Sequence, residues 1–332
     1  MSANAIRNAG RVVRYVKEAT AGTDPGGSFT ITLAAAPTAK LQKKQEYRAS
    51  QALYQGQGGL APARHIKGRE NIPWNASHYL RFKGQGLLWS LIVGAPASPV
   101  NNGDGTYTHK WDLDKDPATA TLSVVEGDAL GSLTTQEHEG HGCVVSSATV
   151  TIDAHDFARL AMSGFAMTAD APASAGAITL TDASYNEIHG HMAGTISWNG
   201  ASYNFISLEL TIPINPIFRD VQGQAGTARP YAVNQKEIRA VVTMDKVGDV
   251  FTGGNTTETT SDLVLTYTDT APNPDHTFTI TLHNAIVVDS DGGNADGFGL
   301  IRERVTFAPQ PDGTDSGLRI TIVNDQSTSE SA

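Results

Sequence analysis

Residues 277–282 read Thr-Phe-Thr-Ile-Thr-Leu, a strict alternation of polar and apolar side chains. A period of two is typical of a β-strand with one buried and one exposed face. Threonine suits the exposed positions, because its β-branched side chain fits a pleated surface and stays polar. The pattern recurs in residues 28–33, 121–124, 207–212 and 319–322. The sequence therefore predicts a mainly β protein built from half-buried antiparallel strands.

Turn signals separate these runs. Asn199-Gly200 supplies the positive φ angles of a two-residue hairpin between two strand-like runs. Residues 289–293, Asp-Ser-Asp-Gly-Gly, indicate another turn. Pro213 and Pro216 end the preceding strand, because proline cannot donate a hydrogen bond to a sheet. We expect a long loop over residues 215–235.

Helix is scarce in this sequence. Residues 87–93 form the best candidate, because they follow two glycines and end at Gly94 and Pro96. The corresponding span of the second half, 247–252, predicts a shorter helix. Residues 157–169 are interpreted as a returning strand, with a helix as the alternative. The ends, 1–27 and 312–332, are expected to stay outside the core apart from residues 319–323, as arms that contact neighbouring subunits or as disordered tails.

Composition limits the classes of protein that fit. A chain of 332 residues suits two domains. The net charge of −10 opposes tight binding to nucleic acid, which requires Lys and Arg to neutralise phosphates. A single cysteine excludes an intrachain disulfide framework and fits a reducing compartment. No apolar run resembles a secretory signal or reaches the roughly 20 residues of a membrane span, so we expect a soluble protein made in a cytoplasm.

A short sequence recurs at half the chain length. Gln55-Gly56-Gln57-Gly58-Gly59 returns as Gln222-Gly223-Gln224-Ala225-Gly226, an offset of 222 − 55 = 167 residues. Each copy is followed by Arg and Pro and then by a strand-like run, residues 78–83 and 238–244. The shared order of features favours a tandem duplication over chance recurrence. We expect domains at 40–170 and 177–310, preceded by an arm and first strand (1–39) and followed by a strand and flexible tail (311–332).

Residues 138–143 contain His, Glu, His and Cys, all metal-ligand types. Their spacing does not match a zinc-binding helix, which needs histidines four apart, or a structural site with four ligands. We interpret the segment as a polar hairpin loop, with metal binding as the alternative. His189 and His191 could chelate from one strand face, but no third ligand lies nearby in the sequence.

Asp289, Asp291 and Asp296 are the best candidates for a cation site. Alternate oxygen ligands around glycines resemble a calcium loop, but the terminal bidentate Glu is missing, so we favour a solvated turn. The sequence contains no nucleophile elbow and no phosphate loop ending in Gly-Lys-Ser/Thr. We therefore expect no enzymatic activity, cofactor or metal.

Several motifs resemble the major tail tube proteins of long-tailed, siphovirus-type bacteriophages. They are residues 69–94, with a strand, a Lys83-Gly84 turn and the Leu87-Leu88 helix, then residues 103–109 and 142–145. The resemblance covers roughly residues 40–309 and rests on the order of features more than on rare residues. It implies a tube-forming antiparallel β-sandwich or small barrel with a short helix and a long loop. The offset of 167 residues places the chain among members with two fused domains.

The resemblance also implies a function and partners. The protein would be a structural component of the virion tail, assembled in the host cytoplasm, whose stacked rings form a channel for DNA. Two domains per chain imply a pseudo-hexameric ring of three chains, with six chains as the alternative. The tape-measure, terminator and distal tail proteins are further expected partners. Contacts between rings are assigned to the two loops, at Gln55, Gly56, Gln57, Gly58, Gly59, Gln222, Gly223, Gln224 and Gly226.

Two other classes share this composition. A capsid or decoration protein would also self-assemble symmetrically. A carbohydrate-binding β-sandwich would show clustered exposed aromatic residues, whereas Trp74, Trp89, Trp111 and Trp198 are scattered along the chain. The acidic net charge fits a channel best, because an acidic lining would let DNA slide without binding.

Overall fold

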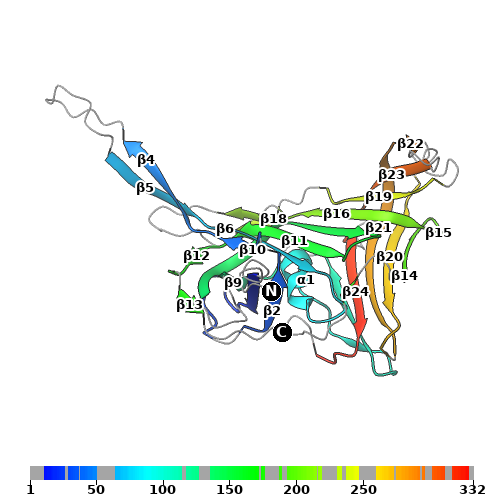
Figure 1. Cartoon of the computed structure of the whole chain (residues 1–332), viewed down its shortest axis with the longest axis horizontal. Helices are drawn as coiled ribbons and strands as arrows, with labels where there is room; N and C mark the ends of the chain where they lie inside the picture. The colour runs from blue at the N-terminus through cyan, green and yellow to red at the C-terminus, as the bar shows by residue number, and fades with distance from the viewer. Residues whose placement is uncertain are drawn as a thin grey trace, which may run out of the picture.

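The protein is mainly β, with one described helix (Figure 1). The computed structural model describes residues 11–26, 29–36, 38–50, 64–113, 117–126, 135–171, 173–175, 187–188, 193–214, 216–218, 230–233, 237–246, 259–272, 274–291, 294–295, 301–310 and 316–328. The elements of the first half are β1 (Arg11–Lys17), β2 (Ile31–Ala35), β3 (Lys40–Leu41), β4 (Lys44–Ser50), β5 (Arg64–Asn71), β6 (Pro73–Tyr79), α1 (Gly86–Val93), β7 (Val100–Asn101), β8 (Tyr107–Asp112), β9 (Ala120–Glu126), β10 (Thr135–Asp153), β11 (Arg159–Phe165), β12 (Thr168–Ala169) and β13 (Ala173–Ala175). Those of the second half are β14 (Ala193–Trp198), β15 (Ala201–Tyr203), β16 (Phe205–Pro213), β17 (Pro216–Phe218), β18 (Pro230–Val233), β19 (Arg239–Asp245), β20 (Ser261–Asp269), β21 (His276–Ser290), β22 (Asn294–Ala295), β23 (Ile301–Ala308) and β24 (Leu318–Asn324).

One sheet runs along the length of the molecule, and we call it the long sheet. Its order is β3, β6, β11, β10, β16, β19, β23, β21, with every neighbouring pair antiparallel. Because β10 pairs with β16, strands from both halves of the sequence form one continuous surface.

Two smaller sheets lie across the long sheet. The first cross sheet has the order β2, β1, β9, β10, with β12 and β13 beside β10. The second cross sheet has the order β15, β14, β20, β21, β24, β8, β7. Figure 1 shows them at opposite ends of the molecule, with α1 between them.

Two long strands each belong to two sheets. The first part of β10 pairs with β9, and its last part pairs with β11 and β16. Likewise, β21 pairs first with β20 and β24 and then with β23. The positive-φ residues Gly142 (64°) and Asn284 (49°) lie where each strand passes from one sheet to the other. These switch points place the cross sheets against the inner face of the long sheet.

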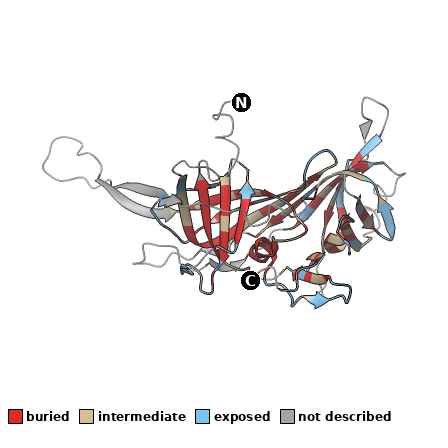
Figure 2. Cartoon of the chain, turned by 60° about the horizontal axis from the view of Figure 1, so that its bottom comes forward, coloured by how far each residue is buried: buried red, intermediate tan, exposed pale blue. Residues whose placement is uncertain are grey.

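The core fills the space between the sheets. Every residue of α1 is buried, and its Trp89 ring lies 5.8 Å from Phe278 of the second cross sheet. Trp111 of β8 donates its Nε1–H to Ser90 Oγ at 3.1 Å, which ties the helix to a strand. Figure 2 shows buried residues on both cross sheets and around α1. The burial of apolar side chains from both halves is the main favourable contribution to the stability of this fold.

Several predictions from the sequence are confirmed. The alternating runs coincide with β2, β9, β16, β21 and β24, although β2 begins only at Ile31. The hairpin at Asn199-Gly200 joins β14 to β15, and both residues have positive φ. The helix predicted at 87–93 is α1, and the returning strand predicted within 157–169 is β11. The helix predicted at 247–252 and the histidines at 189 and 191 lie outside the described residues.

Other predictions are wrong. The expected arm 1–27 contains β1, whose Val13 and Tyr15 are fully buried between β2 and β9. The sequence Arg-Val-Val-Arg-Tyr-Val contains pairs of adjacent apolar residues and was not recognised as a buried strand. Its partner strand β9 lies over a hundred positions away in the sequence. The expected loop 215–235 includes the hairpin of β17 and β18, in which Pro216 takes the first strand position that proline tolerates. The run 78–83 only begins in a strand, since β6 ends at Tyr79.

The expected hairpin loop at 138–143 is also wrong, because these residues lie inside β10. Gly142 bends the strand and the pairing with β9 shifts register between Gly140 and Cys143, so the glycines mark a bulge and not a turn. Similarly, the turn expected from Asp289 begins later, since β21 continues to Ser290.

Candidate functional site

The long sheet has two edges that are exposed in the single chain. Among the described strands, β3 pairs with β6 alone, and β21 beyond Ile286 pairs with β23 alone. Gln42 and Lys44 are exposed beside the first edge, and Val288 (36% exposed) and Asp289 are exposed on the second. An unpaired strand edge is a template for another chain. The two edges are therefore candidate assembly surfaces.

An internal junction shows what such an edge can bind. At the centre of the long sheet, β10 and β16 pair over seven positions, from Ser147 opposite Pro213 to Asp153 opposite Ser207. Ala148 and Ile212 are directly opposed and point inward, and each residue is only 1% exposed. An edge of the first half thus meets an edge of the second half through main-chain hydrogen bonds and an apolar inner layer.

The outer face of the long sheet is lined by small polar side chains. They alternate with the core residues and are half-buried: Asn75, Ser77, Ser147, Thr149, Ser163, Thr211, Thr243 and Thr306. Two arginines on this face are paired, Arg159 with Asp156 at 3.0 Å and Arg239 with Glu237 at 2.8 Å. The charges described on this face are mixed in sign, so its polarity comes from neutral hydroxyl and amide groups more than from an excess of acid.

Two hairpins flank the Gln/Gly loops identified in the sequence. β4 and β5 form a hairpin that extends away from the body of the molecule (Figure 1), and the segment containing Gln55–Gly59 joins its strands. β17 and β18 form a shorter hairpin, and the segment containing Gln222, Gly223, Gln224 and Gly226 joins them. The loop residues themselves lie outside the described residues. In the sequence, each of the two recurring motifs therefore falls between the two strands of an antiparallel pair.

The candidate cation ligands lie near one assembly edge. Asp289 is in β21, and Asp291 follows it and accepts the Arg304 backbone N–H at 2.9 Å. Asp296 lies outside the described residues. One carboxylate is thus already used in the pairing of β21 with β23.

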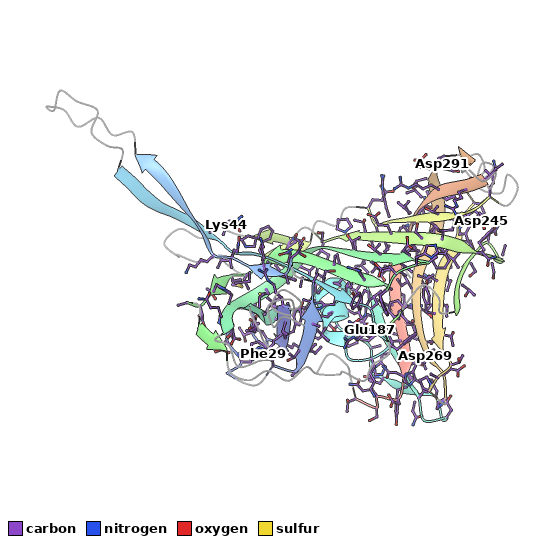
Figure 3. All side chains as sticks on the ribbon, viewed as in Figure 1. Phe29, Lys44, Glu187, Asp245, Asp269 and Asp291 are labelled. Carbon is purple, nitrogen blue, oxygen red and sulfur yellow. The ribbon has the colours of Figure 1, made fainter. Side chains whose placement is uncertain are left out.

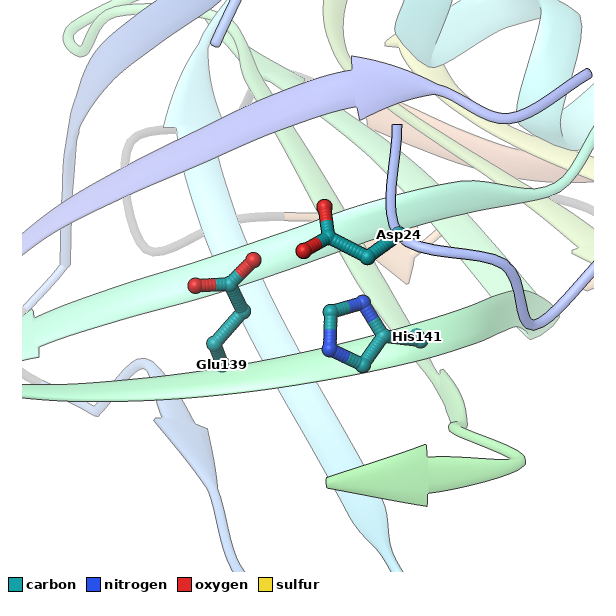
Figure 4. A group of neighbouring side chains, drawn as sticks. All are labelled: Asp24, Glu139 and His141. Carbon is teal, nitrogen blue, oxygen red and sulfur yellow. The ribbon is translucent and has the colours of Figure 1, made fainter. Parts of the chain in front are cut away.

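A different group of metal-ligand side chains comes together where the segment between β1 and β2 meets β10 of the first cross sheet. Asp24, Glu139 and His141 each place one donor atom within 4.8 Å of the others (Figure 4). His141 is buried and has partners, with Nδ1 3.1 Å from Thr121 Oγ1 and Nε2 3.3 Å from Asp170 Oδ2. Burial raises the pKa of Glu139, and His141 opposes that rise. The histidine predicted to lie in a polar loop is therefore part of a buried hydrogen-bond network.

One buried carboxylate lacks a complete set of hydrogen bonds. Glu303 of β23 is 1% exposed, and Ser290 Oγ donates to its Oε1 at 2.6 Å. Its Oε2 is buried and has no hydrogen-bond partner among the described residues. Sequence analysis did not identify Glu303, although it occupies an inward position of β23 in phase with Val305 and Phe307. The sequence did contain a signal for this residue, because Glu303 is charged but falls in the same alternation as the core residues Val305 and Phe307.

Comparison with known proteins gives the family. The sequence matches the family described as Phage tail tube protein over residues 8–321. The chain belongs to this family. No curated protein matches the sequence. This tail tube protein is a structural component of the virion tail, and the family favours that function over a capsid, decoration or carbohydrate-binding role. Among the described residues of the tail tube protein, no helix has the length and apolar character needed to span a membrane.

Proposed function

We propose that the chain is the major tail tube subunit of a long-tailed phage and carries two tandem tube domains, three chains closing each ring. The observation that carries the proposal is a repeated order of strand pairing. In the first half the order is β2, β1, β9, β10, β11, β6, β3, and in the second it is β15, β14, β20, β21, β23, β19, β16.

Irregularities in the strands repeat as well, and they are stronger support than topology. The pairing of β10 with β11 shifts register between Val145 and Ser147, and that of β21 with β23 shifts between Val287 and Asp289. Both bulges follow the positive-φ residue of their strand by the same interval, since 147 − 142 and 289 − 284 both equal 5. Bulges are specific local features, so their coincidence favours descent from one ancestral domain. The pairings suggest units of about 11–175 and 193–324, wider than the domains expected from the sequence.

The long sheet supports a ring of three chains. Each unit contributes four strands in the same order, β3, β6, β11, β10 and β16, β19, β23, β21. Because the two sets are continuous across β10 and β16, both units present their outer face on one surface. A second domain that decorated the outside of a six-chain ring would not share this sheet. Three chains supply six units, and closure of their sheets removes every exposed edge.

The outer face of the long sheet suits a channel for DNA. Short hydroxyl and amide side chains predominate on this face. Of its described arginines, Arg159 and Arg239 have acidic partners, Arg302 lies opposite Asp245, and Arg304 is exposed. Non-specific DNA binding depends on unneutralised Lys and Arg, so a duplex would pass without being held. We therefore propose a mostly neutral polar lining for the channel, and not the acidic lining expected from the net charge alone.

Stacking of rings is assigned to the hairpins. The loops at 55–59 and 222–226 connect β4 to β5 and β17 to β18, where they can contact an adjacent ring. Tape-measure, terminator and distal tail proteins remain the expected partners inside the tube and at its ends, and assembly would take place in the host cytoplasm.

Cryo-electron microscopy of assembled protein tests the proposal. We expect rings of three chains with strict threefold and approximate sixfold symmetry, the long sheet lining the bore. Six chains per ring with one unit at the bore would overturn the trimer, and shells or unassembled monomers would overturn the tube function.

A further inference from the structure

We propose that the end of β21 in one chain pairs antiparallel with residues 40–44 of the next chain, Asp289 opposite Lys44 and Ser290 opposite Lys43. The inference rests on the proposed ring and assigns the interface that closes it. Lys44 and Asp291 lie at opposite ends of the long sheet in Figure 3, so one contact uses two different surfaces. Such a heterologous contact can generate a ring.

The register follows from two rows of paired residues across the long sheet. In the first half Ser147, Ser163, Asn75 and Lys40 are successive partners. In the second half Asp289, Thr306, Val241 and Glu209 are successive partners. Asp289 therefore corresponds to Ser147, and Lys40 corresponds to Glu209.

The internal junction then serves as a template. Ser147 lies opposite Pro213, four residues beyond Glu209 (213 − 209 = 4). The residue four beyond Lys40 is Lys44 (40 + 4 = 44), so Lys44 lies opposite Asp289. At the next position, the pair Ala148 and Ile212 of the internal junction corresponds to Ser290 of one chain opposite Lys43 of the next.

Charge complementarity supports this register on the outer face. Asp289 and Lys44 are both exposed in the single chain, and the pairing brings their opposite charges together. Directly opposed residues of an antiparallel pair have Cβ atoms about 5 Å apart, within reach of an ion pair.

The inner face supplies a second, independent observation. Lys43 is exposed, yet its position corresponds to Ile212, which is buried in the internal junction. Opposite it, Ser290 already donates to Glu303, whose second oxygen has no described partner although it is buried. A buried carboxylate with an unsatisfied oxygen is costly unless a partner completes it. The Lys43 ammonium of the next chain is suited to that oxygen.

Disulfide cross-linking tests the register. The native Cys143 is buried, so the variant pair Asp289→Cys with Lys44→Cys introduces the accessible thiols. Opposed Cα atoms lie within the 4.4–6.8 Å that a disulfide spans, and we expect assembled rings to oxidise to a covalent circle of chains on a denaturing gel. The control Asp289→Cys with Gln42→Cys slips the pair by two residues on the same face, to about 7–8 Å, and should not cross-link.

Charge exchange tests the contacts separately. Asp289→Lys or Lys44→Asp should lower the assembled fraction about tenfold or more, because like charges then oppose each other, and the double exchange should restore assembly. Lys43→Met keeps the aliphatic stem and should impair assembly while the monomer stays folded, whereas Lys110→Met on β8 should assemble normally.

The outcomes separate the interface from the proposed function. Wild-type protein that forms no rings would overturn both. Normal tubes that cross-link in the slipped pair, or that tolerate both charge reversals and Lys43→Met, would overturn the interface and leave the tube function intact.

Discussion

Gly142 in β10 and Asn284 in β21 occupy the same place in two long strands, and each donates its backbone N–H to a carboxylate. The acceptors are Glu18 Oε1 at 2.7 Å and Asp262 Oδ1 at 3.0 Å. Each residue has positive φ and follows a histidine, His141 or His283. The carboxylates accept hydrogen bonds from these N–H groups where each strand bends, and at Gly142, where the contact is buried, this avoids an unsatisfied donor.

Gly142→Ala is expected to destabilise the subunit by about 2 kcal/mol. A side chain at φ +64° is strained, and its Cβ would lie 2.5 Å from Met167 Sδ. Chemical denaturation should show the loss. Asn284→Gly is the matched control and should change the free energy of unfolding by less than about 0.5 kcal/mol, because glycine adopts this conformation freely. Equal effects of the two substitutions would contradict this account of the bend.

Gly164→Ala is expected to cost at least about 4 kcal/mol. In β11 an added Cβ would overlap the Val144 carbonyl oxygen and lie 2.9 Å from the Trp74 ring. Backbone and a buried indole cannot both move aside in a close-packed sheet. Ala161→Ser, at an exposed position of the same strand, should change stability by less than about 0.5 kcal/mol. Thermal and denaturant unfolding of both variants would measure the difference, and a stable Gly164→Ala protein would contradict it.

Acid is expected to weaken the fold through His78. Its Nδ1–H donates to the Ala34 carbonyl oxygen at 2.9 Å, and Nε2 accepts from the Tyr15 hydroxyl at 2.7 Å. Burial lowers the pKa of His78, the Ala34 hydrogen bond opposes this shift and nearby Arg81 adds to it, and together they bring the pKa to about 4. Since the folded state disfavours the protonated ring, stability is complete above the unfolded pKa near 6.5 and falls toward pH 4, by about 3 kcal/mol.

His78→Gln tests this contribution, because glutamine does not titrate. The variant should lose stability at pH 7 but show a flatter decline between pH 6.5 and 4 than the parent protein. His155→Gln, at an exposed position, is the control and should keep the parent's slope. An unchanged slope in His78→Gln would assign the acid sensitivity to other groups.

Shortening the 222–230 segment is expected to leave a folded subunit that no longer elongates. Long uncharged Gly/Gln loops lose much conformational entropy when ordered, so their contacts should form only when rings stack. Circular dichroism would report the fold, and negative-stain microscopy would report tube length. Tubes of normal length from the shortened chain would remove this loop from the stacking contact.

Local sequence was sufficient wherever one segment carried its own pattern. The alternation of 277–282, the hairpin at Asn199-Gly200 and the helix at 87–93 follow from neighbouring residues alone, because side-chain periodicity and positive φ are local properties. The strand β1 was missed because its burial depends on β9, more than a hundred residues away. The Gln/Gly recurrence located two loops but not the hairpins that flank them.

The sequence by itself determined the β class of this protein, its short helix and the family to which its order of features belongs. Only the tertiary structure decided that β10 pairs with β16 to make one long sheet, that His141 lies in a buried network, and that Glu303 has an oxygen without a described partner. Strand pairing between distant segments depends on which edges and inner faces meet in space. That information is distributed over the whole chain and is not contained in any single stretch of it.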